Sequence, residues 1–116
     1  MIMNGYSTVP DGTDSEHPFE CLDKDGNIVT SVEKIKYRVL AKNEEVLTDN
    51  WIDITPPVPS GTIKVPGELN RCRDTGDTKR TISIVATHNG GEKKTGYINY
   101  ALDNNPGVKT ATDLSD

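Results

Sequence analysis

The stretch KRTISIVATHNGGEKKTGYINYAL, residues 79–102, decides the expected fold. Apolar and polar residues alternate on both sides of an Asn-Gly-Gly sequence, and this alternation is typical of two strands that each bury one face. Asn-Gly is also a strong signal for a tight turn between paired strands. The sequence therefore predicts a β-hairpin whose core-facing residues are Ile82, Ile84, Ala86, Ile98, Tyr100 and Leu102.

Earlier segments predict further strands. Residues 35–41, IKYRVLA, place Ile35, Tyr37, Val39 and Ala41 on one face and Lys36 and Arg38 on the other. A helix over residues 33–45 is the alternative, but β-branched and aromatic residues in its middle favour a strand. Short strands are also expected at residues 51–55 and 62–65, and a hairpin at residues 19–29 around an Asp-Gly turn.

The remaining segments carry weaker patterns. Residues 1–18 predict a loosely ordered lead-in, with a short edge strand near residues 6–9. Residues 67–79 are polar and predict a long exposed crossing, and residues 104–116 predict a flexible tail. The β-sandwich domain is thus expected over residues 19–103.

About seven short strands with regularly spaced turns predict an all-β sandwich, with a partly open barrel as the alternative. Residues 33–103 resemble a fibronectin type III domain, or a phage-protein relative of one, in the segments IKYRV (35–39), WIDI (51–54), GTIKV (61–65) and ISIVATHNGG (82–91). The resemblance implies an immunoglobulin-like sandwich of about seven antiparallel strands that serves as a binding or spacer module. Arg80 stands where that family usually has a tyrosine, and Phe19 is the one aromatic residue available for its second-strand tryptophan.

Composition excludes several classes of partner. The net charge is −5, and the 13 lysines and arginines are scattered along the sequence, so we expect no nucleic-acid partner. No apolar run approaches the roughly 20 residues that span a bilayer, so we expect no membrane partner. Residues 1–5 lack the pattern of a signal peptide, and we expect no export signal.

The chemistry-bearing residues do not form a known catalytic pattern. Cys21 and Cys72 are interpreted as two free thiols, with a disulfide between the two sheets as the alternative. Residues 23–27 contain calcium-type carboxylates, but in a calcium loop centred on Gly26 the end positions would be Cys21 and Val32, which lack the required oxygens. With two histidines and no nucleophile motif, the chain is predicted to have no catalytic residue, no metal and no cofactor, and to be no enzyme.

Four residues are candidates for contact with a ligand or partner: Trp51, Tyr97, His88 and Asn89. Trp51, with Tyr37 and Tyr97, could form an exposed aromatic platform for sugar or protein. The alternative, favoured because aromatic residues are few, places Trp51 in the core. His88 is expected to be a solvated residue of the hairpin turn.

These features predict a non-enzymatic structural or interaction domain with protein partners, a component of a phage virion or a surface assembly. It would lie in the virion or in the host cytoplasm during assembly, or outside the cell if a signal peptide lies beyond this sequence. The alternative is a module that binds carbohydrate or protein through the loops around residues 42–50, 56–61 and 88–95. A glycan partner belongs to this alternative.

Overall fold

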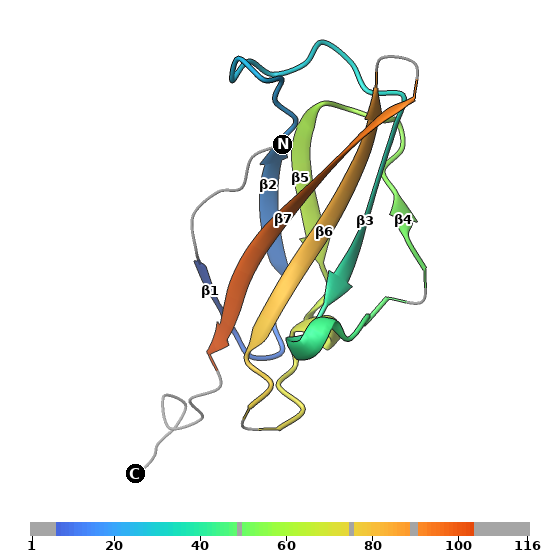
Figure 1. The fold of residues 1–116 in the computed structure, drawn as a ribbon. Helices are drawn as coiled ribbons and strands as arrows, with labels where there is room; N and C mark the ends of the chain where they lie inside the picture. Colours follow the sequence, from blue (N-terminus) through green and yellow to red (C-terminus); the bar gives the residue numbers. More distant parts are fainter. Residues whose placement is uncertain (1–6, 49, 75, 89–90, 104–116) are drawn as a thin grey trace.

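The computed structural model describes residues 7–48, 50–74, 76–88 and 91–103 (Figure 1). Strands account for 53% of these residues and short helices for 8%, so the predicted all-β class is confirmed. No helix in these ranges is long and apolar enough to cross a membrane. The elements are β1 Ser7–Pro10, β2 Ser15–Glu20, β3 Lys34–Leu40, η1 Lys42–Glu44, β4 Ile52–Asp53, β5 Ser60–Val65, η2 Gly67–Asn70, β6 Lys79–His88 and β7 Glu92–Asp103, where η marks a short 3-10 helix.

The strands form two sheets. The larger has the order β1-β7-β6-β3-β4, and the smaller is the pair β2-β5, which lies behind β7 and β6 in Figure 1. All neighbours pair antiparallel except β1, which runs parallel to β7. The expectation of purely antiparallel strands is therefore wrong at this edge, because the chain crosses from β1 to the other sheet instead of turning back beside itself.

The core contains the residues that the alternating patterns predicted. All six core-facing residues of the β6–β7 hairpin are buried, and Ile82 is the register partner of Ile98. On β3, Ile35 and Val39 are buried and Tyr37 packs partly against the core. Burying a large aliphatic side chain contributes about 1.5–3 kcal/mol, so these strands supply most of the driving force for folding.

Strand β2 begins inside the segment that was predicted to be a loose lead-in, so the prediction for residues 15–18 is wrong. Ser15, His17 and Phe19 are buried in turn while their neighbours are exposed. Hydrophobicity does not indicate this alternation, because two of the three buried residues are polar. The edge strand expected near residues 6–9 is present as β1, and the predicted tail at residues 104–116 lies outside the described residues.

The predicted hairpin at residues 19–29 keeps its turn but loses its second strand. The Asp23 carboxylate accepts hydrogen bonds from the amides of Asp25 and Asn27 at 2.9 and 3.0 Å, which is a local Asx-type turn. Beyond the turn, pairing is limited to a single bridge between Leu22 and Ile28. Ile28 is exposed and does not pack against the core, and the strand pairing ends at this bridge.

The segment between η2 and β6, predicted to be exposed, instead carries a buried ion pair. Arg80 is 1% exposed and contacts the carboxylate of Asp77 at 2.7 and 3.2 Å. Its Nε donates to the carbonyl of Leu69 at 2.8 Å and its Nη2 to that of Arg71 at 2.9 Å. These hydrogen bonds connect residues 69–77 to the start of β6. The crossing is therefore held by a buried charged side chain.

Asn70, at the end of η2, connects the two sheets by hydrogen bonds. Its amide nitrogen donates to the Thr13 carbonyl and to the Ser15 hydroxyl, each at 2.9 Å, and its Oδ1 accepts from the Tyr100 hydroxyl at 2.7 Å. Burial raises the pKa of Tyr100 to about 12. The His17 ring stacks on Tyr100 with 4.2 Å between centroids, and burial lowers the pKa of this histidine. Both sheets are joined through these polar side chains.

Candidate binding face

The outer face of the five-stranded sheet gathers basic side chains that are dispersed in the sequence. Successive strand residues point to opposite faces, so the neighbours of the core residues on β3, β6 and β7 point outward. We call this surface the cationic face, and its members are Lys34, Lys36, Arg38, Lys79, Lys93, Tyr97 and Asn99. Asp53, Glu44 and Asp103 are the carboxylates at its margins. Five of the 13 lysines and arginines, although scattered along the sequence, therefore share this face.

Trp51 lies on this face and not in the core, so the core interpretation is wrong. It precedes β4, whose Asp53 is the register partner of Lys36, and this pairing carries the half-buried indole over β3. The Arg38 guanidinium carbon lies 4.4 Å and the Lys36 ammonium 5.1 Å from the ring centroid. Cation–π contacts of this kind contribute about 0.5–1 kcal/mol at exposed sites. The indole therefore orients two cations on the sheet.

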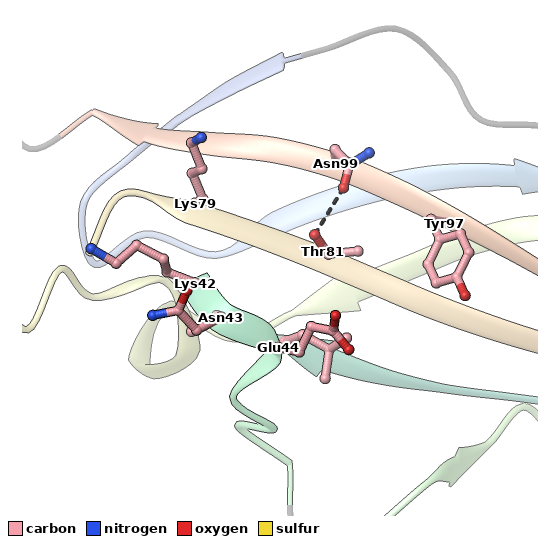
Figure 2. A pocket seen from close by; sticks show the side chains of 9 residues that line it. Lys42, Asn43, Glu44, Lys79, Thr81, Tyr97 and Asn99 are labelled. Atoms are coloured by element: carbon pink, nitrogen blue, oxygen red, sulfur yellow. Dashed lines mark hydrogen bonds between the residues drawn. The ribbon is translucent and has the colours of Figure 1, made fainter. Parts of the chain in front are cut away.

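A hollow of about 630 Å³ opens at one end of the face, where β6 and β7 pass η1 (Figure 2). Its rim carries amide, hydroxyl and charged groups beside the ring of Tyr97. The Thr81 hydroxyl donates to Asn99 Oδ1 at 2.8 Å. This bond orients the Asn99 amide and leaves its NH₂ group to donate to a ligand. The labelled lining residues are Lys42, Asn43, Glu44, Lys79, Thr81, Tyr97 and Asn99.

The backbone at the rim of this hollow is unusual. Asn43 and Glu44 adopt positive φ values of 63° and 61°. Left-handed backbone costs a residue other than glycine about 1–3 kcal/mol and is concentrated at functional sites. These two residues belong to η1, which forms one wall of the hollow.

A smaller hollow of about 240 Å³ lies at the other end of the same face. Three lysines line it, Lys34 and Lys36 from β3 and Lys93 from β7, together with Asp53. Arg38 lies between the two hollows, and Tyr97 lines the side of the larger hollow that is nearest to the smaller one. Both residues are register partners of Ser83 on β6. Tyr97 is 49% exposed there. The face therefore offers positive charge at both ends and an aromatic ring between them.

The structure brings together only two of the four predicted contact residues. Trp51 and Tyr97 share the cationic face, whereas Tyr37 points toward the core and the three-ring platform does not form. His88 is buried at the end of β6, so the expectation of a solvated turn residue is wrong. Asn89 lies outside the described residues. The alternation of β3 contains part of the signal for this face, because burial of Ile35 and Val39 turns Lys36 and Arg38 outward.

The side chains that line the two hollows carry charged, amide, hydroxyl and aromatic groups. Each hollow also has one carboxylate, Glu44 in the larger and Asp53 in the smaller, and no histidine or thiol is among their lining residues. Cys21 and Cys72 are free thiols inside the sandwich or partly covered by it, and burial raises the pKa of both. Within the described ranges, no three histidine, cysteine or acidic side chains gather in a metal-holding group.

A scan of protein-family models and searches of the curated proteins and of the solved structures found no match to this chain.

Proposed function

We propose that the chain is a non-enzymatic interaction domain of an assembly, such as a phage virion or a cell-surface structure, and that it presents the cationic face to a negatively charged partner. The observation that carries this proposal is the accumulation of cations on one sheet face of a chain whose net charge is −5. The partner is a binding partner, and no chemical step is part of the proposal.

The proposal includes an immunoglobulin-like fold. In that fold the second and fifth strands share one sheet, and the third, sixth and seventh strands share the other. The order β2-β5 opposite β1-β7-β6-β3-β4 supports this assignment, with β4 as an additional edge strand. Phe19, buried in β2, supplies an aromatic residue to the core from the second strand.

Arg80 supports the same assignment by an unexpected route. Immunoglobulin-like domains place a tyrosine near the start of the sixth strand, and its hydroxyl bonds to the backbone a few residues upstream. Arg80 stands near the start of β6 and donates to the carbonyls of Leu69 and Arg71. The Arg80 guanidinium therefore makes the backbone hydrogen bonds that the tyrosine hydroxyl makes in that family, and Asp77 neutralises its charge.

The charge distribution on the face also argues for a partner. Like charges that approach each other on a sheet are destabilising, and Lys34, Lys36 and Lys93 line one hollow with a single carboxylate. Glu45 and Asp77 pair with Arg73, and Asp77 also pairs with Arg80, at the crossing that leads into β6. A partner of opposite charge would relieve the repulsion among the lysines.

Chromatography on a sulfonate resin tests the proposal. A protein with a net charge of −5 should pass through such a resin at neutral pH, but we expect this chain to be retained at low salt through the cationic face. Elution should follow at higher salt, because the screening length falls from about 10 Å at 0.1 M to about 3 Å at 1 M.

Two variants with the same change in net charge sharpen the test. The face variant replaces Lys34, Lys36 and Lys93 by glutamine, and the control replaces Lys24, Lys64 and Arg71 by glutamine at exposed positions elsewhere. We expect the face variant to lose retention and the control to keep most of it. Passage of the unmodified protein, or equal elution of the two variants, would contradict the proposal.

The assembly setting has a separate test. Flanking genes that encode head or tail proteins would support a virion component, and flanking genes for unrelated metabolic enzymes would contradict it. Sizing of the purified protein adds the oligomeric state in which the face is presented.

A further inference from the structure

Resting on the proposed function of the cationic face, we propose that its partner is an acidic polysaccharide. One sugar ring would stack on Tyr97, and carboxylate or sulfate groups along the chain would reach the basic side chains in the two hollows. The inference rests on the arrangement of the face, in which the exposed Tyr97 ring lines the larger hollow on the side nearest to the lysines of the smaller one.

The larger hollow has the size and the groups that a sugar requires. Its volume of about 630 Å³ lies within the roughly 300–1,000 Å³ of small-molecule sites. The Tyr97 ring forms part of its wall and gives the apolar face of a pyranose a flat surface. Asn99, Asn43 and Thr81 supply neutral donors and acceptors for sugar hydroxyls. A simple anion would need none of these neutral groups.

The smaller hollow and Arg38 supply the charges. Lys34, Lys36 and Lys93 meet in the smaller hollow, whereas Lys42 and Lys79 line the larger one. Arg38 lies between the hollows, held over Trp51, with its Nε buried and without a hydrogen-bond partner among the described residues. A planar guanidinium held in this way can bind a carboxylate or sulfate through two parallel hydrogen bonds.

The length of the face favours a chain over a single sugar. Lys34 and Leu40 border the two hollows and are the ends of β3. At about 3.3 Å per residue, the strand between them spans about 20 Å. A ligand that touches both hollows and Tyr97 must therefore extend over several sugar units.

Two other polyanions fit the face less well. Protein interfaces bury about 800 Å² on each partner and are depleted of lysine at their centre, whereas here lysines line both hollows. Platforms for single-stranded nucleic acid stack successive bases on several aromatic rings. On the described part of this face Tyr97 is exposed, but Trp51 is covered by Arg38 and Lys36.

Calorimetric titration of the purified chain in 0.15 M NaCl tests the inference. The probes are polygalacturonate, which carries carboxylates, chondroitin sulfate, which also carries sulfates, neutral dextran, poly-glutamate and single-stranded DNA. We expect at least one acidic polysaccharide to bind at least tenfold more tightly than poly-glutamate and DNA, and dextran not to bind. Which of the two polysaccharides binds more tightly identifies the preferred anionic group.

Variants on one strand separate stacking from charge. Tyr97→Ala should weaken polysaccharide binding at least tenfold while leaving elution from the sulfonate resin unchanged, because it removes a ring and no charge. Thr95→Ala, an exposed neighbour on the same face of β7, should change neither. Thermal melts of both variants should match that of the unmodified protein, which shows that the fold is intact.

The failures of the two proposals differ. Poly-glutamate or DNA binding as tightly as the acidic polysaccharides, or Tyr97→Ala without effect, would overturn the sugar inference while retention on the resin leaves the cationic face standing. Absence of both retention and polysaccharide binding would overturn both proposals.

Discussion

Replacing Arg80 by alanine should destabilise the fold more than replacing any other charged residue that the structure describes. The side chain is 1% exposed, and Asp77 is 4% exposed, so the variant leaves a buried carboxylate with less compensation. The carbonyls of Leu69 and Arg71 also lose a donor. All of these losses occur at one point, where the crossing segment joins β6.

The magnitude follows from the contacts. Breaking a buried ion pair by removing one partner costs about 3–5 kcal/mol, and each unsatisfied buried carbonyl costs about 1–3 kcal/mol. These costs overlap because they belong to one network. Asp77 also keeps the side chain and amide of Arg73, at 2.7 and 3.0 Å. We therefore expect a loss of about 3–5 kcal/mol, a large share of the roughly 5–15 kcal/mol that stabilises a domain.

Urea denaturation followed by Trp51 fluorescence and far-ultraviolet circular dichroism measures the loss. With a slope of about 2 kcal/mol per molar urea for a small protein, the midpoint should fall by about 2 M. Arg73→Ala is the comparison, because its side chain is 45% exposed and pairs with the exposed Glu45 as well as with Asp77. Asp77 keeps its buried partner Arg80 in that variant, so the loss should be clearly smaller than for Arg80→Ala. An Arg80→Ala loss no larger than that of Arg73→Ala would refute the reasoning.

Three further changes test the core and its pH dependence. Ile84→Ala should cost about 2–5 kcal/mol in denaturant melts because it leaves a cavity in the core, whereas Val85→Ala on the outer side of β6 should cost clearly less; equal losses would mean that the register is wrong. Tyr100→Phe should cost about 1–3 kcal/mol because Asn70 Oδ1 loses its donor, and unchanged stability would contradict that bond. Burial lowers the pKa of His17 below its usual 6.5, so the unfolded chain takes up the proton first and stability falls as the pH drops below about 6.5; melts of a His17→Gln variant that keep this step would disprove the assignment.

The strands with clean alternation could be predicted from the sequence, because one side of each must face the core. This holds for the predicted core-facing residues of β3, β6 and β7, which are aliphatic or aromatic, although β6 also buries Arg80, Ser83 and His88. Strand β2 could not be predicted in the same way. Its buried positions include Ser15 and His17, which are acceptable inside only because Asn70 and Tyr100 lie against them.

The buried network at residues 67–80 was beyond sequence reasoning for a similar reason. A charged residue such as Arg80 is almost never buried unless it is paired, and its partners are a carboxylate and two backbone carbonyls whose positions depend on the path of the crossing. Local composition therefore indicated an exposed loop where the structure has its most completely bonded side chain.

The cationic face could be predicted in part. The alternation that buries Ile35 and Val39 places Lys36 and Arg38 outward, and the pattern of β7 does the same for Tyr97. Only the order β7-β6-β3 shows that these residues share one surface. Sheet order is a long-range property, and no local pattern in this sequence contains it.

The central claim, that the outer face of the five-stranded sheet is the contact surface, is tested most directly by amide chemical shifts. A ¹⁵N-labelled sample is titrated with polyvinyl sulfonate, a soluble polyanion that carries no sugar. We predict that the largest shifts fall on β3, β6 and β7 and are weakened by added salt, whereas β2 and β5 stay nearly unchanged. Shifts concentrated on β2 and β5, or no shifts at low salt, would contradict the claim.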